Sequence, residues 1–253
     1  MKTALAARYV PRFIPLPPLL PALAAAALFG LGVLVHATGL VDELASRWED
    51  ITFLSQQHME LVAISGGLAI LCGVPFGILL TRPAVRRMAE NAMQVLNIGS
   101  TIPTLAILAL SMSVLGIGEK PAIFALWAAT LLPIVRNTYT GILEVPRHLI
   151  EAATGMGMTP MQILLRVEIP NALYVMFAGI RTALAVNVGT VPLAFLIGGG
   201  GLGELIFTGI DLNEPGMMLS GAIPTATLAV LTDLVVALVA RFVVSRGVMP
   251  GDR

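Results

Sequence analysis

Three ionisable residues, Arg136, Arg181 and Asp233, lie inside long apolar runs of the sequence. A charge at membrane depth is costly unless it is paired, so each of them calls for an explanation. Arg181 lies about 10 residues after the start of its run, and Asp233 lies about 10 residues before the end of its run. With a rise of about 1.5 Å per residue, the two residues therefore fall at similar depths. We therefore predict an Arg181–Asp233 ion pair. The alternative is that both side chains extend toward the nearer membrane face, and for Arg136 we favour such a structural role.

Catalytic chemistry has little support elsewhere in the sequence. His36, His58 and His148 are scattered, without the spacing of metal ligands. No serine or cysteine nucleophile can be matched with a base, and the sequence has no G-x-x-x-x-G-K-[ST] phosphate loop. We expect no catalytic residue, no metal site and no cofactor bound by this chain.

The composition is that of a membrane protein. Hydrophobic residues make up 57% of the 253 residues and charged residues 12%, with a mean hydropathy of +0.88. Soluble proteins carry roughly 25% charged residues, so too few charges remain here to cover a soluble surface. The net charge of zero provides no global field that would attract nucleic acid.

Six apolar stretches are long enough to cross a bilayer, which needs about 20 residues. Without water, continuous apolar runs satisfy their backbone only as helices, so we predict an all-α polytopic membrane protein with six transmembrane helices. The run that begins near residue 16 is longer than the core of a cleaved signal peptide, and we interpret it as an uncleaved first span. The predicted spans are 18–39, 59–81, 91–117, 121–142, 173–197 and 217–243.

Lysine and arginine residues indicate the orientation of these spans. Basic residues gather in the N-terminal tail, in the loops after the second and fourth spans, and in the C-terminal tail. The opposite loops are poor in them: 41–58 has only Arg47 among four acidic residues. Because basic loops stay on the cytoplasmic side, we predict that both termini are cytoplasmic. The chain then divides into a tail, first span and external acidic loop (1–58), a core of five spans with cytoplasmic loop 144–170 (59–243), and a C-terminal tail (244–253).

Two glycine-containing breaks interrupt the spans. Residues 99–103, with Thr101 and Pro103, break the third span and could line a pathway or form a packed kink. A glycine cluster ends the fifth span and could form an external gate, a contact for an external protein or a flexible turn. The cluster consists of Gly198, Gly199, Gly200, Gly201 and Gly203.

The loop 144–170 carries the most informative spacing in the sequence. We predict a short helix over 148–156 that ends at Gly157, because glycine tolerates positive φ. Thr159 and Pro160 are typical of an N-cap and first residue, so a second helix begins there, and Pro170 closes the segment and starts the fifth span. The pattern as a whole is Glu151, Ala152 and Ala153, then Gly157, then Val167, Ile169 and Pro170.

This pattern resembles the EAA loop of ABC-importer permeases. The resemblance implies that 144–170 is a helix-turn-helix that docks in a groove of a cytoplasmic ATPase. Further stretches, including Leu131–Ile142, Ala178–Arg181 and Ile197–Gly203, extend it over about 55–233 and resemble permeases for glycine betaine, carnitine, choline and related osmoprotectants. The segment that begins at Thr190 departs from the small residues that we expect there.

The resemblance also implies an architecture and partners. These are the type I ABC-importer permease fold, a bacterial inner membrane, a second permease subunit that is identical or different, and an external substrate-binding protein. ATP and Mg would be bound by the partner ATPase subunits. The alternatives are a permease for another small solute such as methionine, and an ion-coupled secondary transporter. The latter needs carboxylates at the midplane, for which Asp233 is the one candidate.

Overall fold

A computed structural model describes residues 39–244, and these are helical, with no strand in the part that it describes. The predicted first span and most of both tails lie outside the described residues. The chain divides into two compact units, 1–45 and 46–253. In the first unit the described residues begin helix α2 (Leu40–Ser46). Everything below concerns the second unit.

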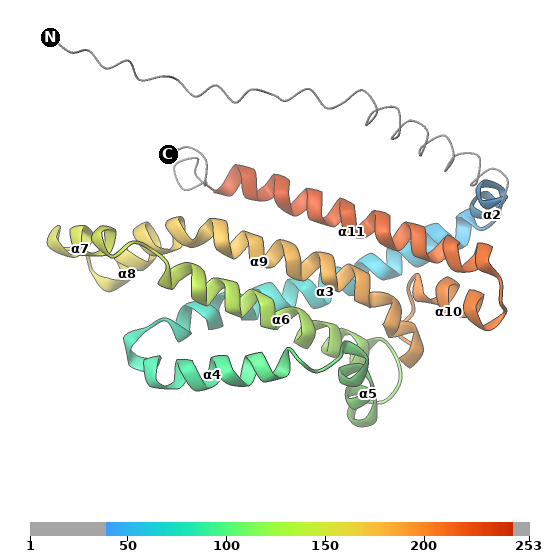
Figure 1. The fold of residues 1–253 in the computed structure, drawn as a ribbon, viewed down its shortest axis with the longest axis horizontal. Helices are drawn as coiled ribbons and strands as arrows, with labels where there is room; N and C mark the ends of the chain where they lie inside the picture. Colours follow the sequence, from blue (N-terminus) through green and yellow to red (C-terminus); the bar gives the residue numbers. More distant parts are fainter. Residues whose placement is uncertain (1–38, 245–253) are drawn as a thin grey trace, which may run out of the picture. The chain divides into compact units, whose positions relative to one another are not determined.

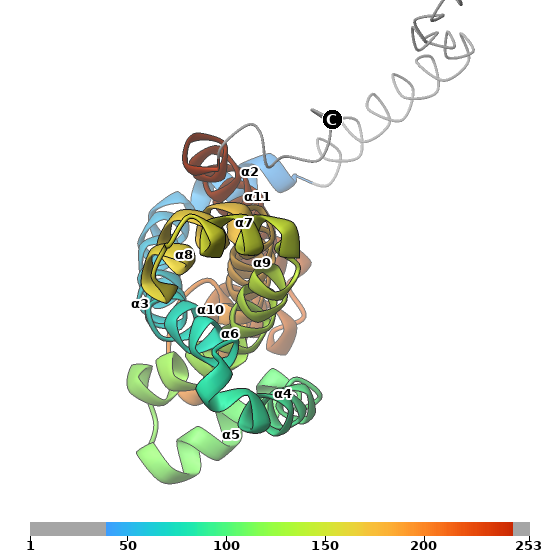
Figure 2. The same cartoon turned by 90° about the vertical axis from the view of Figure 1, so that its left-hand side faces the viewer.

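Four long helices form the frame of the second unit: α3 (Trp48–Leu80), α6 (Glu119–Leu143), α9 (Ile169–Thr190) and α11 (Pro215–Val243). Helix α6 packs against both α3 and α9, and α11 packs against α9. Figures 1 and 2 show α6 and α9 side by side, with the short helices α7 and α8 at one end and α5 and α10 toward the other. The site residues are therefore held by a bundle with α6 and α9 at its centre.

Small residues allow these helices to approach closely, as is usual inside membranes. A Cβ atom on Gly77 of α3 would stand 2.7 Å from the Cβ of Thr138 on α6. On the other side of α6, a Cβ atom on Gly179 of α9 would collide with the Cβ of Asn137. Both contacts require glycine for space, and they fix the distance of α6 from each neighbour.

Buried polar groups add a second link, between α3 and α9. The Nδ2 atom of Asn187 donates a hydrogen bond to Ser65 Oγ at 2.9 Å. His58 Nε2 lies 3.0 Å from the carbonyl oxygen of Val188. All four residues are buried, so these bonds are shielded from competing water.

The predicted spans match the helices in part. Within residues 39–244, three helical stretches could cross a membrane by length and composition: α3, α11, and 160–197, which contains α9. A fourth is possible if the bent pair α4 (Arg86–Gly99) and α5 (Thr104–Leu115) counts as one span. Helix α6 has 25 residues and corresponds to the fourth predicted span, yet it is not among the three, and it carries Arg136 and Asn137. The six-span count stays a prediction.

Two boundaries differ from the sequence prediction. Helix α3 begins at Trp48, so residues 48–58 of the predicted external loop are helical, with Glu49 and Asp50 in the first turn, where negative charge stabilises a helix. At the other end of the bundle, α9 stops at Thr190 and a 3-10 segment, Val191–Ile197, follows. Pro192 stands in its first turn, where a missing N–H is tolerated.

The close approach of α6 and α9 generates a prediction. Gly179→Ala should destabilise the protein by about 1–3 kcal/mol, because the added methyl overpacks the contact with Asn137. The matched control is Gly189→Ala on the same helix, where a Cβ would meet nothing within 4 Å. The midpoint of thermal unfolding in detergent measures both variants. An equal midpoint for the two variants would contradict the close-packing account.

Candidate functional site

Helix α7 (Arg147–Gly155) is the first half of the predicted helix-turn-helix, one residue from its expected bounds at each end. It ends at Gly157, whose φ of +79° is left-handed. The N–H of Gly157 donates to the Thr154 carbonyl at 2.9 Å, and the N–H of Met158 donates to the Ala153 carbonyl at 3.1 Å. This is the pair of bonds of a Schellman ending, so the turn is set by the local sequence.

The second half begins where it was predicted. Thr159 caps α8 (Pro160–Ile163): its backbone N–H donates to Gln162 Oε1 at 2.9 Å, and the Gln162 N–H donates to Thr159 Oγ1 at 3.4 Å. This reciprocal capping box satisfies two donors that the helix leaves open. The turn between α7 and α8 is therefore held by local hydrogen bonds and does not depend on a large hydrophobic core.

Pro170 stands in the first turn of α9, where the sequence predicted that the next span would start. The junction itself was not predicted: a π-helical turn (Leu164–Glu168) continues directly into α9. The N–H of Ile169 bonds the Leu164 carbonyl five residues back, and this wider turn gives the proline ring room. Asn171 Nδ2 donates to the Val167 carbonyl at 2.7 Å next to the ring. We call 144–170 the coupling segment.

The coupling segment presents an apolar surface. Ala153 and Ile163 are buried, whereas Met156, Met161 and Leu165 are 73%, 63% and 56% exposed. Glu151 and Ala152 are exposed, and Val167, Ile169 and Pro170 are half-buried. Exposed apolar side chains grouped on one short segment are typical of a surface that binds another protein.

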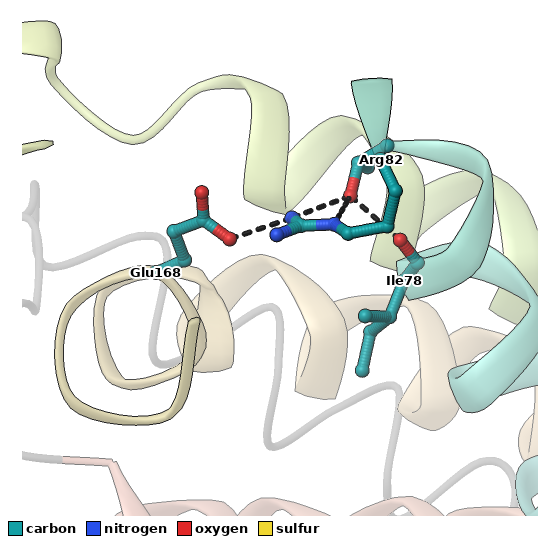
Figure 3. Close-up of polar contacts among 4 residues, drawn as sticks. Ile78, Arg82 and Glu168 are labelled. Carbon is teal, nitrogen blue, oxygen red and sulfur yellow. Dashed lines mark hydrogen bonds and ion pairs between the residues drawn. The ribbon is translucent and has the colours of Figure 1, made fainter. Parts of the chain in front are cut away.

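Two contacts hold the coupling segment on the bundle. Ile150 and Leu164 pack against a buried cluster at the ends of α6 and α9 that contains Ile142, Ala172 and Met176. Glu168 accepts a hydrogen bond from Arg82 Nη2 at 2.6 Å, shown in Figure 3. Arg82 follows the end of α3, so this ion pair joins residues 86 positions apart.

A polar groove of about 660 Å³ runs along α6 and α9 beside the break between α4 and α5. Among the described residues, no carboxylate and no aromatic residue lines it, and Arg136 is its one charged residue. The groove thus offers hydroxyls, amides and one guanidinium to a passing solute. It is lined by Leu96, Asn97, Gly99, Ser100, Ile102, Thr104, Ile107, Ala129, Thr130, Leu132, Pro133, Arg136, Asn137, Thr140, Thr182, Ala183, Val186, Asn187 and Thr190.

The break in the third predicted span is a sharp bend. The helical stretches Met88–Gly99 and Thr104–Leu115 meet at 96°. Thr101 Oγ1 donates to the Ile98 carbonyl at 2.7 Å, and Ser100 Oγ donates to the Asn97 carbonyl at 2.7 Å. Two side-chain hydroxyls thus satisfy carbonyl groups in the last turn of α4. Thr101 and Pro103 do not line the groove, although Ser100, Ile102 and Thr104 beside them do.

The glycine cluster forms a tight turn between the 3-10 segment and α10 (Gly203–Asp211). Gly198, Gly200 and Gly201 have φ values of +77° to +82°, which other residues rarely adopt. Gly199 N–H donates to the Ala194 carbonyl, Gly201 N–H to Gln57 Oε1 of α3 at 3.2 Å, and a Cβ on Gly203 would collide with the Pro192 carbonyl. The cluster is therefore a packed turn in this structure.

The structure brings Arg181 and Asp233 together. Arg181 Nη2 donates to Asp233 Oδ2 at 2.6 Å, and its Nε donates to Oδ1, so the pair is bidentate and joins α9 to α11. The side chains are 47% and 31% exposed, and they line a cavity of about 640 Å³ with Tyr174 and Arg241. In this chain alone, the Arg181–Asp233 ion pair is therefore partly exposed on the side of this cavity.

Comparison with known proteins identifies the family. Residues 73–245 match the family described as the inner membrane component of binding-protein-dependent transport systems. The chain belongs to this family. It is 52% identical over 207 residues to the osmoprotectant import permease protein OsmY of Salmonella typhimurium, covering 82% of this chain and 87% of the relative. It is 41% identical to the choline transport system permease protein OpuBB of Bacillus subtilis, over 80% of this chain and 92% of the relative.

The fold has a solved counterpart. One chain of the methionine ABC transporter MetNI, in an inward-facing conformation, superposes with a TM-score of 0.70 at 26% identity, covering 77% of this chain and 96% of that one. The comparisons confirm the resemblance to osmoprotectant permeases, and the relatives named above are transport permease proteins.

Sequence reasoning missed two contacts of the site. The Arg82–Glu168 pair was not predicted, because nothing in the local sequence relates residues so far apart. The Ser65–Asn187 bond was missed for the same reason. A usable signal existed for both, since isolated polar residues at the ends or middle of apolar helices need a partner.

The ending of α7 can be tested. Gly157→Ala should speed amide hydrogen exchange in α7 by roughly tenfold, because a side chain in the left-handed region costs about 1–2 kcal/mol. Gly155→Ala is the matched control, since a Cβ there meets nothing within 4 Å and alanine favours helix. Unchanged exchange in the Gly157 variant would show that tertiary contacts, not the Schellman ending, hold α7.

The Arg181–Asp233 pair gives a second prediction. Each single variant, Arg181→Asp and Asp233→Arg, should lower the thermal unfolding midpoint in detergent, because two like charges then face each other between α9 and α11. The charge-swapped double variant should recover most of the loss. A double variant as unstable as the sum of the two singles would mean that the residues act separately.

Proposed function

We propose that the chain is the transmembrane permease subunit of an ATP-binding-cassette importer that moves an osmoprotectant across the bacterial inner membrane. The solute would be glycine betaine, choline, carnitine or a related compound. The observation that carries the proposal is the coupling segment, whose predicted pattern folds into an exposed helix-turn-helix. Relatives that match most of the chain are permeases of such systems.

The energy would come from a partner. The sequence has no phosphate loop, so ATP and Mg would be held by separate ATPase subunits. The exposed Met156, Met161 and Leu165, beside Glu151 and Ala152, provide the surface on which such a subunit would dock. This arrangement requires the coupling segment and both termini on the cytoplasmic side, in agreement with the basic loops.

A second permease subunit, identical or different, would complete the pathway. The polar groove lies along one side of this chain, and a facing copy would enclose it. The packed glycine turn and α10 lie at the end opposite the coupling segment (Figure 1), where an external substrate-binding protein would deliver the solute.

The groove's chemistry supports passage rather than tight binding. Quaternary ammonium groups are held firmly by aromatic faces or by carboxylates, and neither is found among the described residues that line the groove. The hydroxyls and amides can replace water around a polar solute one contact at a time. Strong selection would then belong to the external binding protein.

Methionine is the second candidate solute, because a chain of a methionine ABC transporter shares the fold. The identity to that chain is 26%, against 52% for the osmoprotectant permease, so the osmoprotectant is favoured. An ion-coupled secondary transporter is not supported by the groove, since none of the described residues that line it is a carboxylate that could bind a coupling ion.

The test is to purify the chain with its associated proteins and to reconstitute the complex in liposomes. We expect an ATPase subunit to copurify and an external binding protein to complete the system. ATP should then drive uptake of radiolabelled glycine betaine, choline or carnitine, with stimulated ATP hydrolysis, and methionine serves as the comparison solute.

Two outcomes would contradict the proposal at different levels. A complex without any ATPase would overturn the importer class. Uptake of methionine but of no osmoprotectant would leave the importer class standing and would show that the proposed solute is wrong.

A further inference from the structure

We infer that the ion pair between Arg82 and Glu168 transmits movement of the coupling segment to the groove, which makes these two residues positioning residues for transport. The inference rests on the proposed function and deepens it. It concerns a link inside this chain, on the membrane side of the coupling segment, away from the surface that would meet the ATPase.

The geometry singles out this contact. Glu168 is the last residue of the π-helical turn, and its carboxylate lies 2.6 Å from Arg82 Nη2. The side chains are 26% and 13% exposed, so the bond is better shielded than an ordinary surface ion pair. Figure 3 shows Arg82 lying between Glu168 and the end of α3.

Arg82 is itself held rigidly. Its Nη2 and Nε donate to Thr81 Oγ1 at 2.7 and 3.0 Å, and that hydroxyl donates to the Ile78 carbonyl at 2.7 Å. The backbone N–H of Arg82 also donates to the Leu79 carbonyl. A displacement of Glu168 would therefore move the backbone at the end of α3, because the Arg82 side chain is not free to rotate and absorb the displacement.

From Arg82 the chain leads directly to the groove. The Val85 N–H donates to the Arg82 carbonyl at 3.1 Å across the short 3-10 turn Pro83–Val85, and α4 begins at the next residue. The far end of α4 reaches the 96° bend, where Asn97 and Ser100 line the groove. One continuous path thus joins the coupling segment to the bend.

Helix α4 is suited to move as a lever. It packs on α3 and α6 along one face, through Ala89, Ala92, Met93 and Leu96, while Met88, Val95 and Ile98 are about two-thirds exposed. The π turn at the other side of the ion pair closes its hydrogen bond over five residues, a feature that frequently occurs at functional sites. The ion pair therefore joins this π turn to the junction between the packed α3 and α4, one face of which is exposed.

The experiment measures solute molecules moved per ATP hydrolysed, in liposomes that contain the complete complex. Arg82→Gln and Glu168→Gln should each keep ATP hydrolysis near the wild-type rate and lower this ratio by roughly fivefold, the lower range of allosteric coupling. The double variant should be no worse than either single, because both remove the same bond. Arg82→Lys, which keeps the charge, should recover part of the ratio.

The matched control is Glu90→Gln, which removes an exposed carboxylate of α4 that does not line the groove and should leave the ratio unchanged. An unchanged ratio in both single variants, or losses that multiply in the double variant, would overturn the inference. Variants that no longer assemble a complex would also overturn it, since the pair would then be a structural brace. A wild-type complex that moves no solute with ATP would instead refute the proposed function.

Discussion

The close contact of α6 with α3 on one side and α9 on the other is the constraint on which the structure depends. Inside a membrane, helices gain little from excluding water, so association relies on shape and on polar bonds. Gly77 and Gly179 supply the shape, because any side chain there would collide with Thr138 or Asn137. Arg136 and Asn137, which precede Thr138 on α6, line the groove. The packing that holds the bundle also positions the residues that a solute would meet.

The coupling segment obeys a different rule. It buries few side chains, and its shape comes from local devices: the left-handed Gly157, the reciprocal bonds of Thr159 and Gln162, and the π turn before Pro170. A surface shaped in this way can stay rigid while its apolar residues remain free for a partner. Its firm connections to the membrane part are a small apolar cluster and the Arg82–Glu168 pair.

These two rules explain which features could be predicted from the sequence. The caps, the turn glycine and the break before Pro103 depend on residues that are neighbours in sequence, and they lie within a residue or two of where they were expected. The start of α3 was placed too late, because acidic residues were interpreted as a loop although they also stabilise the first turn of a helix. The π turn before Pro170 was not predicted, because a π turn cannot be recognised from composition. Long-range bonds such as Ser65–Asn187 leave no local signal beyond an unpartnered polar residue.

Two tasks, the choice of solute and the control of the direction of transport, depend on different parts of the chain. A pathway that held its solute tightly would have to break strong contacts in every cycle, and the energy of ATP would be spent on release. The described side chains that line the groove offer hydroxyls, amides and one guanidinium. On the proposed function, control of direction would come from changes in the shape of the groove. The bend between α4 and α5 forms part of its wall, and α4 is joined by the chain to Arg82. Solute choice can therefore vary among relatives without alteration of the machinery that moves the wall.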